Sequence, residues 1–468
     1  MSNRPLRTTI GLAAFAVSLS AGPASGQRIG EPEQSSREAP VVRLASLSPR
    51  DARVHEPLWS LAAPAAPALD NARAPVVTWH GTAFLATVHW AGAPDAPLKA
   101  LVERTGKTRW TSAFSAQPMA ASDGLVYAAG ARGIVAFDVA TGALRWTAPG
   151  VWVQIVDRVA IISTGERLEA RDAATGRLRW SARWIGYARN VKPDIVPDGV
   201  NAVGTTLLAH TVEHGATTTG FEYAYDLRDG RALWKMQAYA FLGNLAHDAI
   251  ALDTTWAPAS LAGYAPLHVS VVALATGAVR EAHAYAPDPK RWKQEAEREA
   301  DVQFANERNE VAIDGDALVF RIGPATVYRY PIDADPGVVL GTSYELGALK
   351  HLGGNTWLAS TTDGEAGLAH LGPRGATLQK LAGLHDVAFT GVYGGYALVL
   401  SPHRATVFAA DDPRGAVTTR FPCPIDLRSV EIGGSFPRVV LSEGALVVAC
   451  RFGGPANRVV ALALPQRS

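Results

Sequence analysis

The clearest catalytic spacing in the sequence is His210-Thr-Val-Glu213-His214, which matches the inverted zinc-protease pattern H-x-x-E-H. That chemistry needs a helix, because residues four apart then lie on one face. The Thr- and Gly-rich flanks, residues 205–208 and 216–220, predict a strand and a turn instead. Residues four apart on a strand are separated by about 13 Å, too far to share one metal ion. We therefore expect strand histidines here and no metal site.

Other polar groups also fall short of a catalytic arrangement. The acidic pairs at Asp314/Asp316 and Asp333/Asp335 lie beside Gly or Pro, which predicts turns. No Gly-rich phosphate loop leads from a strand into a helix, and no G-x-S-x-G nucleophile elbow occurs. The formal net charge of +1 gives no electrostatic footprint for nucleic acid.

One stretch is locally basic. Its members are Arg167, Arg171, Arg177, Arg179, Arg183, Arg189 and Lys192. A solvated charged edge that blocks strand-on-strand association explains them better than an anionic-ligand surface does.

The chain has two cysteines, Cys423 and Cys450. In an oxidising compartment they can form one disulfide that closes the last part of the fold. The alternative is two buried thiols, since cysteine often behaves as a small core residue. The sequence alone leaves both open.

The elements that carry these residues are short strands in a repeating unit. Residues 133–147, GIVAFDVATGALRWT, predict a β-hairpin with a tight Thr-Gly turn and Trp146 on its outer strand. Similar units end at Trp110, Trp180 and Trp234. Trp110, Trp146 and Trp180 follow one another at intervals of 36 and 34 residues. One such hairpin cannot bury its apolar face alone, whereas stacked copies can.

Self-similarity at this period predicts an all-β propeller of four-stranded blades over residues 57–465. The strand signals form nine sets, but propellers typically have four to eight blades, so we expect about eight, with seven to nine open. The last set has three strands. The isolated strand around Trp59 can supply its fourth and close the ring with strands from both ends of the chain.

The blade motif A-x-D-x-x-T-G-x-x-x-W resembles that of the quinoprotein-type, PQQ-like repeat propellers. The residues that carry it are Asp138, Thr141, Gly142 and Trp146; Asp172, Thr175, Gly176 and Trp180; Asp226, Asp229, Gly230 and Trp234; and, in partial copies, Trp110 and Trp59. The resemblance implies that each Asp hydrogen-bonds turn amides and each Trp packs into a neighbouring blade, so we expect these residues to be structural.

That superfamily includes pyrroloquinoline-quinone dehydrogenases and the propeller component of the outer-membrane protein assembly machinery. The dehydrogenases carry two adjacent cysteines and a calcium-binding set of acidic and amide side chains. This sequence has no adjacent cysteines, and we can assign no calcium ligands. We therefore expect no cofactor, PQQ and calcium being without support.

The N-terminus has the order of a secretory signal peptide, with basic residues, an apolar stretch over residues 10–19 and small residues up to Gly26. We interpret residues 1–26 as the signal peptide and residues 27–56 as a disordered linker. Residues 287–306 are charged and have apolar residues at four-residue spacing, which predicts a helical insertion on the propeller. It is a candidate partner-binding element.

Two function classes follow. The first is an exported, periplasmic or secreted, non-catalytic scaffold that binds another exported or envelope protein and has no membrane span. The alternative is a quinone-dependent dehydrogenase-like enzyme or a small-ligand binder that uses the central funnel of the ring. The sequence predicts neither the partner nor the oligomeric state.

Overall fold

The computed structural model describes most of the chain outside the first forty residues. The described ranges are residues 41–62, 76–86, 97–187, 193–214, 218–238, 240–245, 248–254, 267–285, 310–314, 317–322, 326–331, 340–343, 348–360, 364–372, 375–387, 389–423, 438–450 and 458–465. All regular secondary structure within these ranges is β-strand. The expected signal peptide and the helical insertion at residues 287–306 lie outside the described residues.

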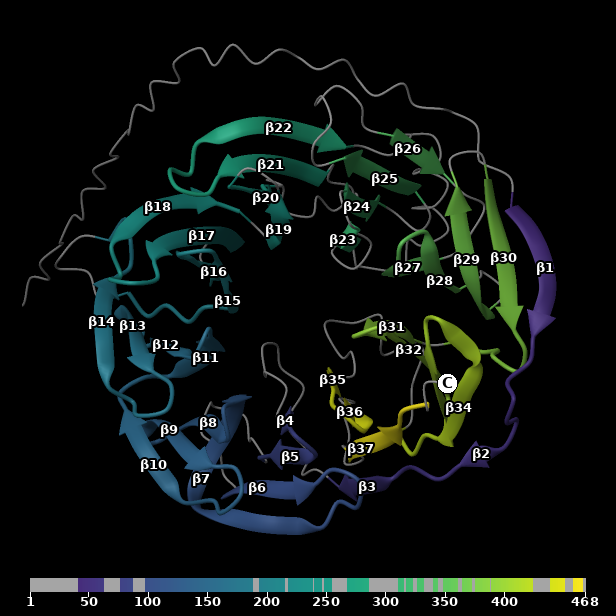
Figure 1. Cartoon of the computed structure of the whole chain (residues 1–468), viewed down its shortest axis with the longest axis horizontal. Helices are drawn as coiled ribbons and strands as arrows, with labels where there is room; N and C mark the ends of the chain where they lie inside the picture. Colours follow the sequence, from purple (N-terminus) through teal and green to yellow (C-terminus); the bar gives the residue numbers. More distant parts are fainter. Residues whose placement is uncertain are drawn as a thin grey trace, which may run out of the picture.

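The strands form a ring of small antiparallel sheets (Figure 1). Over the described residues the hydrogen bonding divides into nine four-stranded blades, which we number I to IX in chain order. The predicted β-propeller is confirmed. The number lies at the top of the expected range, because every set of strand signals builds a regular blade.

Blades I to IV occupy the first half of the ring. Blade I contains β4 (Val76–Trp79), β5 (Thr82–Leu85), β6 (Pro97–Val102) and the first half of β7 (Thr108–Ser122), and blade II contains the second half of β7, β8 (Leu125–Gly130), β9 (Gly133–Asp138) and β10 (Leu144–Ala148). Blade III contains β11 (Trp152–Val156), β12 (Val159–Ser163), β13 (Arg167–Asp172) and β14 (Leu178–Arg183), and blade IV contains β15 (Gly199–Val203), β16 (Thr206–His214), β17 (Thr218–Asp226) and β18 (Ala232–Gln237).

Blades V to VIII follow. Blade V contains β19 (Ala240–Leu245), β20 (Ala249–Asp253), β21 (Leu267–Ala273) and β22 (Val279–Tyr285), and blade VI contains β23 (Glu310–Asp314), β24 (Ala317–Ile322), β25 (Thr326–Pro331) and β26 (Leu340–Ser343). Blade VII contains β27 (Ala348–Gly353), β28 (Thr356–Ser360), β29 (Ala366–Gly372) and β30 (Gly375–Leu381), and blade VIII contains β31 (Phe389–Tyr393), β32 (Tyr396–Ser401), β33 (Arg404–Ala409) and β34 (Asp412–Arg420).

Blade IX combines the two ends of the described chain. Its strands are β35 (Arg438–Leu441), β36 (Ala445–Cys450), β37 (Arg458–Ala463) and, from the N-terminal side, β3 (Trp59–Ala62). β3 pairs antiparallel with β37, with Trp59 opposite Ala461. Blade IX also contacts blade I, where the Thr78 hydroxyl donates to the Leu441 carbonyl. The ring is therefore closed by the first and last blades, as Figure 1 shows.

Blades I and II share one strand. The first half of β7 pairs with β6, and the second half, from Ala116 to Ser122, pairs with β8. The strand therefore passes from the outer edge of one blade to the inner edge of the next without a loop. This continuity merges two blades into one seven-stranded sheet.

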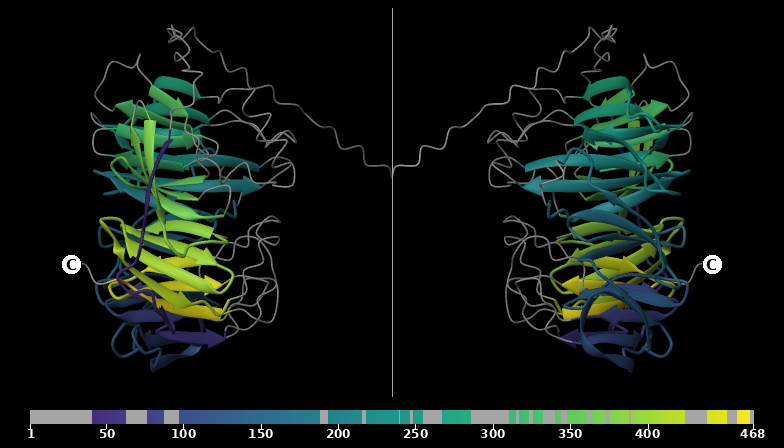
Figure 2. Two further views of the ribbon diagram at one scale, coloured as in Figure 1. Left: turned by 90° about the vertical axis from the view of Figure 1, so that its right-hand side faces the viewer. Right: turned by 90° about the vertical axis from the view of Figure 1, so that its left-hand side faces the viewer.

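The expectation of a disordered linker over residues 27–56 is wrong for its second part. β1 (Val41–Leu47) pairs parallel with β30 of blade VII, and β2 (Val54–His55) pairs parallel with β34 of blade VIII. Residues 41–62 thus run along the outside of three consecutive blades (Figures 1 and 2). Backbone hydrogen bonds to two sheet edges order this segment although most of β1 is exposed.

Indole side chains join consecutive blades. Each indole N–H donates to a backbone carbonyl of the next blade around the ring. The pairs are Trp59 with Glu103, Trp110 with Val139 at 2.8 Å, Trp146 with Ala173 at 2.9 Å, Trp180 with Leu227 at 2.8 Å and Trp234 with Leu274 at 2.7 Å. These bonds connect five consecutive seams, from IX–I to IV–V. In blade V the sequence has Glu281 at the corresponding position.

Each of these indoles also lies on a turn glycine of the next blade. Gly176, for example, has φ +72°, and a Cβ atom added there would be 2.7 Å from Cδ2 of Trp146. The turn therefore needs glycine twice, for the left-handed backbone and for the close approach of the indole.

Candidate binding surface between blades III and IV

The aspartates of the blade motif organise their own turns. Asp138 Oδ1 accepts from the Thr141 amide and hydroxyl, both at 2.9 Å, and its Oδ2 lies 2.6 Å from Arg145. Asp172 makes the same contacts with Thr175 and with Arg179. Because these bonds satisfy amides of the tight turn, the residues hold blade architecture rather than a reacting group.

Blade IV uses a variant of this turn. Asp226 accepts from the Arg228 amide at 3.0 Å and pairs with the Arg228 guanidinium at 2.6 Å. Asp229, in the place of threonine, accepts from the Arg231 amide at 2.9 Å. Gly230 follows and contacts Trp180 of blade III.

The neighbouring arginines shift the acidities of these carboxyl groups. Arg145, followed by Thr141, lowers the pKa of Asp138 to about 2. Arg179 and Thr175 lower the pKa of Asp172, and Arg228 lowers that of Asp226. Hydrogen bonds to the charged form cause each shift.

The H-x-x-E-H residues lie on strand β16, so the strand expectation is met and the helix that a zinc site requires is absent from this segment. His210 Nδ1 lies 3.3 Å from Glu222 Oε2, directly across on β17. Burial raises the pKa of Glu222, although His210 opposes the shift. Among the described residues, no group of three or more His, Cys, Asp or Glu is arranged to hold a metal ion.

Cys423 follows β34 and is buried in the apolar cluster that blades VIII and IX share. It is disulfide-bonded. The sequence has one other cysteine, Cys450.

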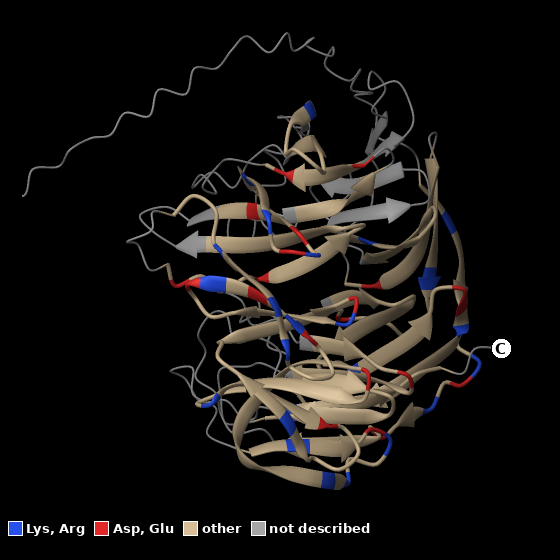
Figure 3. Cartoon of the chain, turned by 60° about the vertical axis from the view of Figure 1, so that its left-hand side comes forward, with Lys and Arg blue, Asp and Glu red and all other residues tan. Residues whose placement is uncertain are grey.

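The basic stretch of blade III is largely paired internally. Arg171 contacts Glu169 at 2.7 Å, and Arg167 donates to the Ser181 hydroxyl at 2.7 Å. Arg179 pairs with Asp172. Figure 3, which brings blades III and IV forward, shows basic and acidic residues interspersed along these strands and turns. The described arginines thus match a charged edge, while Arg189 and Lys192 lie outside the described residues.

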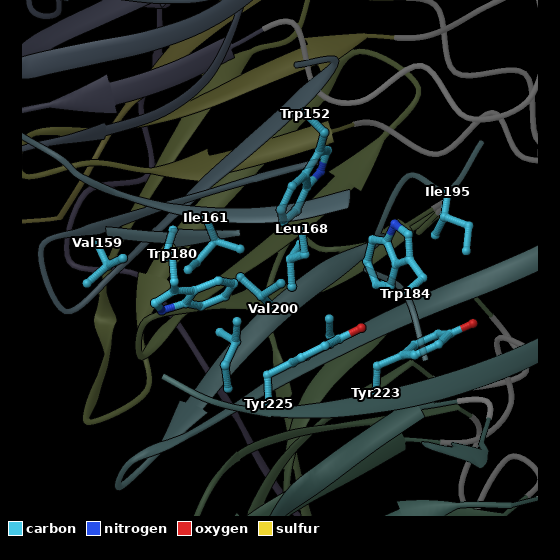
Figure 4. Packing of buried hydrophobic residues seen from close by; sticks show 13 residues of the cluster. Trp152, Val159, Ile161, Leu168, Trp180, Trp184, Ile195, Val200, Tyr223 and Tyr225 are labelled. Carbon is cyan, nitrogen blue, oxygen red and sulfur yellow. The ribbon is translucent and has the colours of Figure 1, made fainter. Parts of the chain in front are cut away.

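An aromatic cluster fills the seam between blades III and IV (Figure 4). Trp184 and Tyr223 are buried and make an edge-on contact with ring centroids 5.1 Å apart. The Trp184 indole donates to the Gly165 carbonyl at 3.1 Å, and the Tyr225 hydroxyl donates to the Arg183 carbonyl at 3.2 Å. These bonds satisfy the polar tips of large side chains and fix the residues that follow β14 against blade IV.

The outer part of this cluster reaches the surface. Tyr187 and Phe221 are half-buried and pack against it. The Lys235 ammonium lies over three rings, 3.8 Å from the Phe221 centroid, 4.7 Å from Tyr223 and 5.1 Å from Tyr187. We call Tyr187, Phe221, Tyr223 and Lys235 the aromatic patch. Half-exposed aromatic side chains that lie beside a cation are typical of protein contact sites.

Sequence reasoning missed the aromatic patch because its members are far apart in the chain. Tyr223 and Lys235 are opposite each other on β17 and β18, which a hairpin register can predict. Tyr187 comes from the connection after β14 of another blade, and only the packing of the two blades brings it there.

Part of the repeat region matches a known protein family. Residues 94–238 match the PQQ_2 family model, which is described as "Outer membrane protein assembly factor BamB". The resemblance to PQQ-like repeat propellers is confirmed, and the matched residues run from β6 of blade I to β18 of blade IV. No curated protein matches the chain significantly.

Several solved structures are similar to the chain at low sequence identity. BamB from Moraxella catarrhalis is 14% identical, with a TM-score of 0.41 over 74% of this chain and 96% of its own. A quinohemoprotein alcohol dehydrogenase from Comamonas testosteroni is 12% identical, with a TM-score of 0.42 over 92% of this chain and 79% of its own. A computationally designed protein, Ika8, is 12% identical, with a TM-score of 0.39 over 69% and 91%. The blade architecture follows from the strand pairing of this chain itself.

In the described part of the chain, no helix has the length and apolarity needed to cross a membrane.

Proposed function

We propose that the chain is an exported, non-catalytic scaffold that binds another exported or envelope protein through the aromatic patch. The observation that supports this most is the grouping of half-buried rings and a cation at the seam of two blades, inside the segment that matches an assembly-factor model. Large aromatic side chains that are already held in place lose little conformational entropy when a partner covers them.

The charge of the aromatic patch determines the kind of partner. The Lys235 ammonium lies over the rings of Tyr187, Phe221 and Tyr223 and gives the aromatic patch a positive charge. A segment that offers carboxylates beside an apolar side chain complements this arrangement. The partner proposed is therefore an envelope protein with an acidic, partly apolar docking segment.

A photo-crosslinking residue in place of Tyr187 tests the proposal in envelope extracts. We expect one defined crosslinked protein, which Lys235→Gln weakens and Lys235→Glu removes. Lys107→Glu is the matched control, because Lys107 is exposed on a turn of blade I. No crosslink, or equal loss with the control variant, would contradict the proposal.

The enzyme alternative has a separate readout. The purified chain is incubated with PQQ and calcium, and absorbance and dye reduction with alcohols are measured. A bound quinone with turnover would replace the scaffold proposal by the dehydrogenase-like one. We expect neither, since the blade motif residues are engaged in turns and seams.

A further inference from the structure

The N-terminal segment covers a groove between blades VII and VIII. Residues 47–54 cross from β1 to β2, and contacts with both blades hold this crossing in place. The Ala382 amide donates to the Leu47 carbonyl at 2.8 Å, and Arg50 pairs with Asp412 at 2.8 Å. Figure 2 shows β1 outside the green strands of blade VII. This crossing forms one wall of a space whose other walls are two blades.

Two neighbouring cavities lie at the crossing. The inner one has a volume of about 280 Å³, and most of its lining is apolar. It includes Leu47, Val54, Leu381, Leu384 and Ala416. The outer one has a volume of about 580 Å³ and shares Val54 and Arg404 with the first. We call the smaller, mostly apolar cavity the channel, and it adjoins the second compartment at Val54 and Arg404.

The second compartment is basic. Arg404 on β33 and Arg420 on β34 both line it, together with His403 and the apolar Phe421 and Pro422. The two arginines are direct partners in the antiparallel register and extend from the same face of the sheet. Like charges placed opposite each other destabilise a sheet, so this pair is costly for the fold alone.

The described chain neutralises this pair poorly. Arg420 Nε lies 3.4 Å from Glu56 Oε1, and both side chains are 71% exposed. Such an exposed pair contributes little to stability. Arg404 has no salt bridge or side-chain hydrogen bond with any residue that the structure describes. Two guanidinium groups beside one exposed carboxylate leave room for an anion, which arginine binds in a bidentate way.

We infer that this groove binds an amphipathic anion. The carboxylate or phosphate head lies between Arg404 and Arg420, in place of Glu56, and an acyl or similar apolar chain enters the channel beneath residues 47–54. The combination of a mostly apolar channel with a few convergent polar groups at one end is typical of small-molecule sites. A free fatty acid and the acyl chain of a membrane lipid share this chemistry.

Calorimetric titration of the whole protein with decanoate tests the inference. Decanol and decyltrimethylammonium have the same chain with a neutral or a positive head. We expect decanoate to bind at least about tenfold more tightly than either. Joint substitution of Arg404→Gln and Arg420→Gln should weaken decanoate binding by at least about tenfold. Arg109→Gln, which removes an exposed arginine from β7, should leave binding unchanged.

Two further variants separate the parts of the site. Ala52→Phe adds volume at an exposed position on the crossing that lines the channel, so it should shorten the longest fatty acid that binds. In the unliganded protein, removal of one arginine relieves the like-charge pair, so Arg404→Gln should raise the melting temperature while losing the shift that decanoate causes. A variant that simply misfolds would lower it.

Cosedimentation with phosphatidylglycerol vesicles distinguishes the two sources. Decanoate that displaces the protein from vesicles identifies the groove as the lipid site, and decanoate binding without vesicle binding identifies a free fatty acid. The inference is overturned if decanoate does not bind at millimolar concentration. It is also overturned if the three head groups bind equally, or if the double substitution and Arg109→Gln have the same effect.

Discussion

The contact between an indole and a turn glycine can be measured with one pair of substitutions. Gly176 and Gly124 have nearly equal dihedral angles, φ +72° and +76°. A Cβ atom at Gly124 would meet nothing within 4 Å, whereas one at Gly176 would lie 2.7 Å from Trp146. Gly124→Ala therefore reports the cost of the left-handed backbone alone. Gly176→Ala reports that cost together with displacement of the indole.

The expected magnitudes differ clearly. An alanine in the left-handed region costs about 1–2 kcal/mol, and this applies to both variants. At Gly176 the indole must also move, which adds about 1–3 kcal/mol of overpacking. Loss of the 2.9 Å bond from Trp146 to the Ala173 carbonyl adds about 0.5–1.5 kcal/mol. We therefore expect Gly176→Ala to cost about 1.5–4.5 kcal/mol more than Gly124→Ala.

Urea unfolding followed by far-UV circular dichroism provides the assay, because this signal reports mainly the backbone and persists in variants that lack Trp146. Trp146→Ala, made alone and with Gly176→Ala, completes a double-mutant cycle. Without the indole, Gly176→Ala should cost no more than Gly124→Ala. If the two glycine variants lose equal stability in the wild-type background, or if the cycle shows no coupling, the contact does not stabilise the seam.

Three further predictions concern the ring closure and the buried or turn carboxylates. Trp59→Ala should cost about 3–5 kcal/mol, and hydrogen exchange should place the loss at β3, β37 and blade I. Because the pKa of Asp138 is lowered to about 2, the folded state binds fewer protons than the unfolded state below about pH 4. The unfolding free energy should therefore fall from pH 4 toward pH 2. Asp138→Asn should make the unfolding free energy less dependent on pH in this range. The raised pKa of Glu222 has the opposite effect on the pH dependence of stability, because its stabilising contribution is present at low pH and lost as pH rises. The unfolding free energy of Glu222→Gln, measured with urea, should therefore rise relative to that of the wild type between pH 5 and pH 8. A difference between the two proteins that stays constant with pH would contradict the assignment.

The blades that could be predicted are those whose information is local. In blades II and III the alternation of residues, the turn glycine and the tryptophan all lie within one hairpin, so the strands and the turn follow from the sequence. The same reasoning placed β3 at the edge of the last blade, because Trp59 resembles an outer-strand tryptophan without a preceding hairpin.

Three features have no local signal in the sequence and could not be predicted. β1 is held to β30 by backbone pairing, and five of its seven residues are exposed, so no hydrophobic period indicates the strand. The aromatic patch unites Tyr187 with residues of the following blade. Arg404 and Arg420 become neighbours only through the register of β33 and β34. In each case the residue types are ordinary, and the neighbourhood gives them a role.

The pairing of β3 with β37 has a consequence for how the chain reaches its native state. Ser60 and Arg458, which bond across this pair, are 398 residues apart. Translation releases β3 before any blade exists, and its partner strand follows almost 400 residues later. Contacts of such long range form slowly. A chain that lacks β37 leaves the edge of β3 unpaired, so blade IX and the ring are complete only once β37 is present.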